Sequence, residues 1–301
     1  MNPSRFVASA VAIALLSAPA LLARQDARER QVLVSITGRN DVPTTGLTAA
    51  DFDVREDGKS VEVVRVAPAP PPSHLALVID DSGTLNSLGV VTSLREALKA
   101  VIATASTSMK GTQVALIGAA DPPLMRMPFT ADLSKAEAAI EQIGPRSGAD
   151  GALLETLSMT LNDLQQRKAV HPVVVVFLAE DSSENGRVKP NAIEAALKAS
   201  GASLWTLAYE SRKTGDDMEI TQSVGDRSAV VSDINRRSGG VERRMNSPQS
   251  LAQAFNRMIT MIGSRYEVTY LRPAGATAAP RNFEVRSRKG GTVAAPRWAG
   301  Q

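Results

Sequence analysis

Cysteine is absent from the 301-residue sequence, and aromatic residues make up only 4% of it. Without cysteine there is no disulfide framework, no thiolate zinc site and no lipid-modified cysteine near the start of the chain. The few aromatic side chains leave little means of stacking on sugars or on nucleic-acid bases. A net charge of +3, spread along the chain, likewise does not indicate nucleic-acid binding. A packed hydrophobic core must therefore stabilise the fold.

Long apolar runs are also scarce, and the notable one lies at the start of the chain. Met1 to Ala23 holds a single Arg5, an apolar stretch from Phe6 to Leu22, and small residues at Ala18 and Ala20. This arrangement is typical of an export signal, and the stretch is short for a spanning helix, which needs about 20 residues. We therefore predict that residues 1–23 are a cleaved signal peptide and that no integral membrane segment remains. The protein is then exported to the periplasm, the cell envelope or the medium.

Residues 24–66 are predicted to form a small N-terminal β-segment. Gln31 to Thr37 alternates apolar and polar residues, Ser60 to Val66 is rich in β-branched residues, and Asp57-Gly58 supplies a turn between them. The Pro-rich stretch 67–73 should follow as an extended, rather stiff linker.

From residue 74 to residue 264 the pattern changes to apolar strands that alternate with amphipathic helices. This alternation is the signature of an α/β fold with a mostly parallel sheet and helices on both faces. Residues 265–301 are predicted to form a C-terminal β-hairpin tail, and Ser211 to Arg227 should be irregular. The strands of the main domain are expected at 75–79, 113–119, 125–129 (an antiparallel edge strand), 173–178 (central), 203–209 and 241–245, and the helices at 88–105, 133–143, 153–164, 190–197, 230–237 and after Ser247-Pro248.

The most suggestive chemical motif follows the first of these strands. Asp80, Ser82 and Thr84 occupy alternate positions of one turn, where the strand gives way to a helix. In a parallel sheet, ligands bind outside the carboxyl ends of the strands. One carboxylate and two hydroxyls at this place suit a hard divalent cation such as Mg²⁺. The spacing is equally consistent with Asp80 and Ser82 capping the helix through its free N–H groups.

The fragment IDDSGT resembles the Asp-x-Ser-x-Ser metal-ion-dependent adhesion motif (MIDAS) of von Willebrand factor A (VWA) domains, with Thr84 in the last hydroxyl position. The likeness extends to GLTAADFDVREDGK before the domain, and to NRRSGGVERRMNSPQSLAQAFNRMI and SRYEVTYLRP after it. These blocks are similar to the secreted bacterial VWFA-related proteins. The resemblance implies a Rossmann-like VWA domain between short β-segments, which mediates protein binding and has no enzymatic activity.

The sequence departs from that family at two other metal-contacting loops. Gly151 stands where the family carries a threonine, and Leu178 stands where it carries an aspartate. Asp150 and Asp181 lie nearby as possible substitutes, but each is displaced in register, and a solvated loop acid is the simpler interpretation. We therefore expect a degenerate adhesion site that binds Mg²⁺ (or Mn²⁺) weakly or not at all.

Other chemistries find little support. A receiver domain needs a phosphorylatable aspartate and a lysine at later strand ends, where this chain has Leu178 and Tyr209. A hydrolase needs a nucleophile with a base in reach, yet His74 and His171 are predicted at strand starts, at the opposite end of the sheet from Ser82.

Two functions remain open from the sequence. The first is an exported module that binds a protein or peptide through the loops at 80–84, 146–151 and 179–185. The second is a metal-independent structural scaffold of the cell envelope, with its partner surface on the β-segments or on the basic tail. We use this name for the C-terminal segment that carries Arg281, Arg286, Arg288, Lys289 and Arg297.

Overall fold

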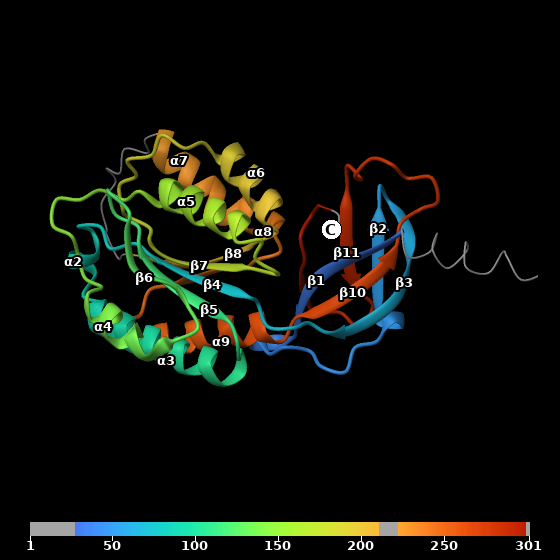
Figure 1. Ribbon diagram of the computed structural model, residues 1–301, viewed down its shortest axis with the longest axis horizontal. Helices are drawn as coiled ribbons and strands as arrows, with labels where there is room; N and C mark the ends of the chain where they lie inside the picture. Colours follow the sequence, from blue (N-terminus) through green and yellow to red (C-terminus); the bar gives the residue numbers. More distant parts are fainter. Residues whose placement is uncertain (1–27, 211–221, 299–301) are drawn as a thin grey trace, which may run out of the picture.

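The computed structural model describes residues 28–210 and 222–298, so the predicted signal peptide at 1–23 lies outside the described residues. The described chain forms an α/β domain beside a β-sheet domain, and the second is built from both ends of the chain (Figure 1). Among the described residues, no helix combines the length and the apolar character needed to cross a bilayer.

A six-stranded sheet forms the centre of the α/β domain, in the order β6-β5-β4-β7-β8-β9. Its strands are β4 (His74–Ile79), β5 (Gln113–Gly118), β6 (Leu124–Thr130), β7 (Val173–Ala179), β8 (Ser203–Tyr209) and β9 (Glu242–Met245). Only β6 runs antiparallel to its neighbour, and it lies at the edge. The predicted mostly parallel sheet with one antiparallel edge strand is therefore confirmed. Every residue of β7 is buried, as its unbroken apolar sequence requires.

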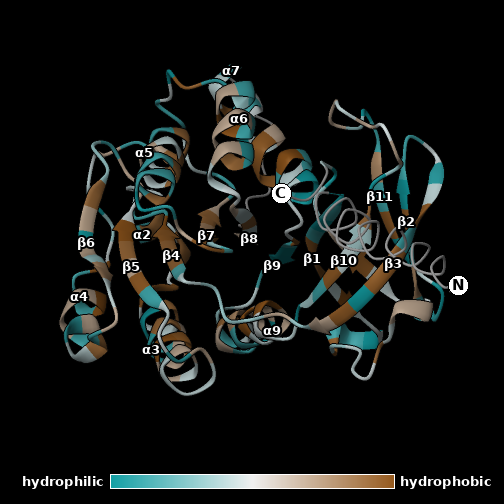
Figure 2. Ribbon diagram, turned by 45° about the vertical axis from the view of Figure 1, so that its right-hand side comes forward, coloured by the Kyte–Doolittle hydropathy of each residue, from teal (hydrophilic) through white to brown (hydrophobic). Residues whose placement is uncertain are grey.

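Helices cover both faces of this sheet (Figure 1). One face packs against α3 (Val91–Ser108), α4 (Ala136–Glu141) and α9 (Leu251–Gly263), and the other packs against α5 (Leu153–Gln166), α6 (Pro190–Ser200) and α8 (Asn235–Arg237). The helix α7 (Gln222–Ala229) lies against α6 and leads into α8. The alternating residues of each strand face opposite sides, so the domain has two apolar cores. Figure 2 shows the hydrophobic colour concentrated along β4 and β5, between these helical layers.

A second six-stranded sheet combines the two ends of the chain, in the order β11-β2-β3-β10-β1-β12. Its strands are β1 (Glu29–Thr37), β2 (Phe52–Glu56), β3 (Lys59–Pro68), β10 (Tyr266–Leu271), β11 (Phe283–Ser287) and β12 (Thr292–Ala294). Their inward-facing side chains share one apolar core. The α/β domain is thus inserted between β3 and β10 of a single β-sheet.

The predicted C-terminal hairpin is wrong. β10 lies between β3 and β1, and β11 pairs with β2 instead of β10. The alternating pattern of both segments identifies them as strands and determines which side chains turn inward, but it says nothing about the partner strand. Partners more than two hundred residues away in sequence complete the sheet, as Glu29 opposite Leu271 illustrates.

Three local expectations also need correction. The helix predicted from Leu88 is interrupted, because Gly89 has a left-handed φ of 62° and ends the short α2 (Leu85–Leu88) before α3 begins. The predicted linker at 67–73 starts within a strand, since β3 continues to Pro68, opposite Tyr266. Of the stretch predicted as irregular, residues 211–221 lie outside the described residues, and the remainder from Gln222 to Arg227 is helical. It belongs to α7, which continues through a π-helical segment into α8.

Candidate functional site

The parallel strands end at one edge of the α/β sheet, and three loops meet there. They are residues 80–84 after β4, residues 146–151 before α5 and residues 180–188 after β7, and we call them the top loops. Backbone hydrogen bonds connect them: Gly83 N–H donates to Ala149 O over 3.0 Å, and Gly151 N–H donates to Ser183 O over 3.2 Å. The topology therefore places the predicted site residues at the edge where ligands bind in parallel sheets.

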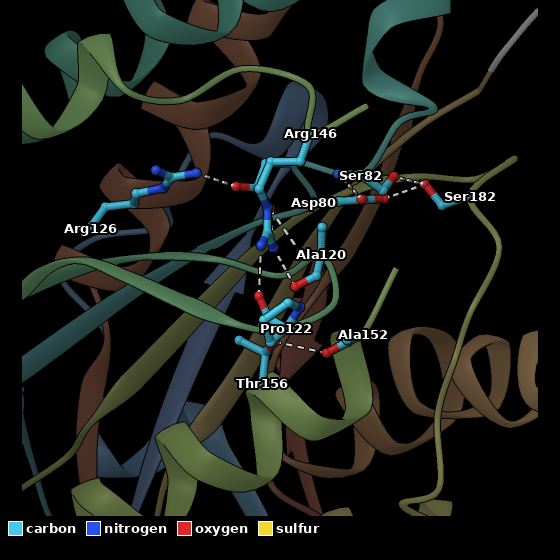
Figure 3. A network of polar contacts seen from close by, with 10 residues as sticks. Asp80, Ser82, Ala120, Pro122, Arg126, Arg146, Ala152, Thr156 and Ser182 are labelled. Carbon is cyan, nitrogen blue, oxygen red and sulfur yellow. Dashed lines mark hydrogen bonds and ion pairs between the residues drawn. The ribbon is translucent and has the colours of Figure 1, made fainter. Parts of the chain in front are cut away.

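Asp80 is 2% exposed and has protein donors on both carboxylate oxygens. Its Oδ1 accepts from Ser82 N–H at 3.2 Å, and its Oδ2 accepts from Ala179 N–H at 3.2 Å and from the Ser182 hydroxyl at 2.5 Å. The Ser82 and Ser182 hydroxyls are also 3.1 Å apart. Figure 3 shows Asp80, Ser82 and Ser182 as one compact cluster. Asp80 and Ser82 therefore come together as the sequence predicts, with a third member that the motif did not include.

The other predicted ligands do not join this cluster. Thr84 is half-buried at the start of α2, and its side chain makes no capping hydrogen bond. Asp150 is exposed and accepts from the Ser183 hydroxyl at 2.5 Å. Asp181 is half-buried, and its Oδ2 has no hydrogen-bond partner. No hydrogen bond connects any of these side chains to Asp80.

The two departures from the family pattern have different structural settings. Leu178 is 3% exposed and belongs to the apolar core beneath α5 and α6, so it offers no oxygen at this position. Gly151 lies against the loop after β7, where an added Cβ would stand 2.5 Å from Ser183 O. A threonine at 151 would therefore collide with this backbone, and the loop occupies the space that the missing side chain would need.

Arg227, from α7, supplies the positive charge on this side of the site. It is 2% exposed, and its guanidinium donates to Ser182 O at 2.5 Å and to Glu180 O at 2.8 Å. Burial lowers the pKa of Arg227, and the negative charges of Glu184 and Asp80 oppose that shift. Arg227 thus lies within electrostatic range of Asp80 and holds the loop that carries Ser182. Arg227 was not predicted as a site residue, because the polar stretch before it shows no helical periodicity.

Glu184 fixes the start of α5 from the same loop. It is 7% exposed, and its two carboxylate oxygens accept from Leu154 N–H at 3.1 Å and from Leu153 N–H at 3.3 Å. Burial raises the pKa of Glu184 to about 7, although these N–H groups and Arg227 act in the opposite direction. The top loops therefore contain a carboxyl group that titrates near neutral pH.

Asp81 carries a second buried negative charge with its own partners. Its carboxylate is fully buried and accepts from Arg126 at 2.9 Å, from Arg146 at 3.2 Å and from Ala120 N–H at 2.9 Å. Gly118 makes room for it, because an added Cβ there would stand 2.3 Å from Asp81 Oδ2. Figure 3 shows Arg126 and Arg146 together on the side of Asp80 away from Ser182. In the sequence, the consecutive acids Asp80 and Asp81 directly after a buried strand are the sign of such partners. A buried aspartate needs a cationic partner.

These residues do not match the donor set of the family's metal site. Asp80 offers a single carboxylate whose oxygens already accept three hydrogen bonds. Backbone fills the threonine position, and the buried Arg227 guanidinium lies within electrostatic range of Asp80. Within residues 28–210 and 222–298, no three His, Asp or Glu side chains cluster in a way that suits a metal ion. The geometry instead favours a site closed by hydrogen bonds.

Comparison with known proteins finds one family match, within the α/β domain. Residues 75–185 match the family model described as von Willebrand factor type A domain. None of the curated proteins matches the chain.

Several solved structures are similar. BatB from Bacteroides thetaiotaomicron shares 16% identity over 62% of this chain and 98% of that chain, with a TM-score of 0.47. A von Willebrand factor type A protein from Catenulispora acidiphila shares 12% identity over 91% of this chain and 74% of that chain, with a TM-score of 0.48. Proximal thread matrix protein 1 from the mussel byssus, with a zinc-occupied MIDAS motif, shares 15% identity over 69% of this chain and 49% of that chain. Its TM-score is 0.49. This chain thus spans about half of the mussel protein.

Proposed function

We propose that this chain, whose α/β domain is a von Willebrand factor type A domain, binds a protein or peptide through its top loops without a metal ion. The predicted signal peptide at 1–23 supports an exported location for this activity. Three features support the proposal: the connection of the top loops into one surface, the internal neutralisation of the two buried acids, and the polar side chains that the loops expose.

The connection between the loops is the observation that carries the proposal. Besides the backbone bonds already described, Arg146 N–H donates to Asp81 O at 2.9 Å and Asn185 N–H donates to Gly151 O at 2.7 Å. Loops held in one arrangement lose little conformational entropy when they bind a partner. A rigid scaffold that positions surface loops is a common basis of recognition. The exposed side chains on this surface include Ser147, Asp150, Ser183 and Asn185.

Internal charge balance supports binding without a metal. In a metal site, Asp80 would give its charge to the ion, whereas here Ser82, Ala179 and Ser182 donate to it and Arg227 lies in range. Mg²⁺ demands near-octahedral oxygen coordination, and a lone carboxylate with hydroxyls already paired to each other offers little of it. The contact with a partner would then consist of hydrogen bonds and van der Waals packing.

The alternative scaffold function would place the partner on the basic tail, but part of its charge is paired. Arg286 lies 2.7 Å from Glu284, and Lys289 lies 3.3 Å from Asp51. Surface pairs of this kind leave less net charge for an anionic partner. This observation favours the top loops as the binding surface.

Site-specific photocrosslinking tests the proposal. A photoreactive amino acid replaces Ser147 on the top loops or, as a control, Met159, which is 57% exposed on α5. Cells that express each variant are irradiated with EDTA and, separately, with Mg²⁺. We expect discrete protein adducts from position 147 in both conditions and none from position 159.

Adducts at position 147 that vanish in EDTA would contradict binding without a metal. Adducts that form only when the photoreactive residue replaces Arg286 on β11 would instead support the scaffold function. Equal adduct patterns at positions 147 and 159 would show that the top loops have no special part in binding.

A further inference from the structure

A cavity of about 490 Å³ lies between the two domains, at the end of the α/β sheet opposite the top loops. Its walls come from β1, the segment between α5 and β7, the turn between α6 and β8, and the chain around Pro296 and Trp298. This volume lies within the range of small-molecule sites, roughly 300–1,000 Å³. Domain interfaces are also a preferred place for such sites.

Arg265 lines this cavity as a buried cation without an acidic partner. It is 4% exposed, and its guanidinium donates to Ile262 O at 3.1 Å and, more weakly, to the Ser203 hydroxyl at 3.4 Å. Its Nη2 has no hydrogen-bond partner. Burial alone lowers the pKa of Arg265 to about 10, so the side chain stays charged at neutral pH. A buried charge without a counter-ion costs several kcal/mol, which an anion in the cavity would offset.

The rest of the lining agrees with an anionic ligand. Lys168 and His171 also line the cavity, and the described lining residues include no Asp or Glu. Glu267 approaches His171 Nε2 at 3.9 Å, but it lies outside the lining and outside the residues that influence Arg265. The cavity therefore has a positive charge that the protein itself leaves unbalanced.

The cavity also has an apolar side. Leu164, Pro172 and Trp298 line the cavity, and the Trp298 ring is held in place by Lys198, whose Nζ lies 5.3 Å from its centroid. Such walls would bury a hydrocarbon or aromatic group and exclude water from the guanidinium. An anion with no apolar part would leave most of this space unfilled.

We propose that this interdomain cavity binds a small organic carboxylate, with the carboxylate on Arg265 and its apolar part against Trp298, Pro172 and Leu164. A planar guanidinium matches a carboxylate, which can accept two parallel hydrogen bonds from it. The Ser203 hydroxyl lies beside the same guanidinium. Because this site is at the opposite end of the domain, it does not depend on the function proposed for the top loops.

The test uses the full chain and defined probes. Thermal unfolding is measured with acetate, hexanoate, 3-phenylpropanoate, 3-phenylpropanamide and inorganic phosphate, each at about 10 mM so that weak binding still shifts the transition. We expect hexanoate and 3-phenylpropanoate to raise Tm, acetate to raise it less, and the neutral amide to bind about tenfold more weakly or worse, since it lacks the charge-assisted hydrogen bonds. Quenching of Trp298 fluorescence should accompany binding and disappear in Trp298→Phe.

Variants connect the shift to the cavity. Arg265→Gln should lose the response to both carboxylates, whereas Arg257→Gln removes a charge from α9 outside the cavity and should keep it. Without a probe, Arg265→Gln should be no less stable than the wild type, because an unpaired buried charge has been removed. Should Arg265→Gln unfold, Lys168→Gln at the cavity still tests the site, with a smaller loss of affinity.

Three results would overturn the proposal. The first is the absence of an Arg265-dependent shift with every carboxylate, and the second is equal binding of the acid and its amide. The third is an Arg265-dependent response to phosphate alone, which would assign the site to inorganic anions. None of these results changes the crosslinking expected at position 147, so failure here is distinguishable from failure of the proposed protein binding.

Discussion

The two ends of the α/β domain differ in how their buried charges are balanced. At the top loops, Asp81 is matched by Arg126 and Arg146, and Asp80 by three donors with Arg227 in range. At the opposite end, Arg265 is buried without a carboxylate partner and lines a cavity.

This contrast indicates which site needs something from outside the chain. A charge that is neutralised internally gains little from a bound ion, while an unbalanced charge is stabilised by a ligand of opposite sign. At the end of the fold whose sequence resembles the adhesion motif, the protein itself thus supplies the partners of its buried acids. The end that carries no family motif is the one with a charge to satisfy.

The largest effect is expected when a buried acid is removed from the top loops, because cations there then lose their partner. Asp81→Ala leaves Arg126 and Arg146 without their shared acid, so the free energy of unfolding should fall by about 3–5 kcal/mol. Urea denaturation followed by circular dichroism measures this change. Asp163→Ala, which removes an exposed pair with Arg167, should change it by less than about 1 kcal/mol. Equal effects would show that Asp81 is not a buried, paired charge.

Titration of Glu184 tests the charge balance of the top loops, because it changes their net charge near neutral pH. Its folded-state pKa is about 7, above its ordinary value of 4.5, so between these pH values the folded protein holds a proton that the unfolded chain has released. The free energy of unfolding should therefore fall as pH rises from 4.5 to 7, by up to about 3 kcal/mol. Denaturation of wild type and Glu184→Gln across this range should show that the substitution removes this fall in the free energy of unfolding, while the contributions of other titrating groups remain. Glu137→Gln, at an exposed position, is the control and should retain the slope.

Restoring the family's threonine tests how far the loop after β7 has closed the site. Gly151→Thr brings a Cβ to 2.5 Å from Ser183 O, so we expect a loss of about 1–3 kcal/mol, measured by thermal unfolding. Thr156→Ser, which keeps the buried hydroxyl of α5, provides a comparison of similar size nearby. A stable Gly151→Thr variant that gains a response to Mg²⁺ would show that the site can still open.

The smallest expected effect is the response to metal. Millimolar Mg²⁺, Mn²⁺ or EDTA should leave the Tm of the wild type unchanged, because Asp80 is already satisfied. A ligand present at about 100 times its Kd would add about 2.7 kcal/mol, which such a measurement detects readily. A shift that Asp80→Ala abolishes would contradict metal-independent closure.

The sequence predicted the α/β domain well because its signals are local. The unbroken apolar run of β7 and the leucine stripe of α5 identify a central strand and a covering helix without knowledge of their partners. The β-sheet domain was harder, since alternation recognises β10 and β11 as strands but does not select their neighbours. Those neighbours come from the other end of the chain.

The site was predictable only in its motif. Asp80 and Ser82 follow directly from strand position and spacing, whereas Ser182 and Arg227 reach them across about a hundred residues or more of sequence. Arg265 gives no signal of its own, because a lone arginine before a strand is normally exposed. Its isolation depends on the packing of two domains, which no local pattern encodes.

The arrangement of the β-sheet also has a consequence for biosynthesis. β1 emerges first from the ribosome, yet both of its neighbours, β10 and β12, are made last. During that interval its inward-facing side chains, among them Val32, Val34 and Ile36, have no sheet to cover them. An apolar strand with two free edges is prone to pair with other chains. Nascent chains that stop before Tyr266 should therefore aggregate, even when their α/β domain has already folded.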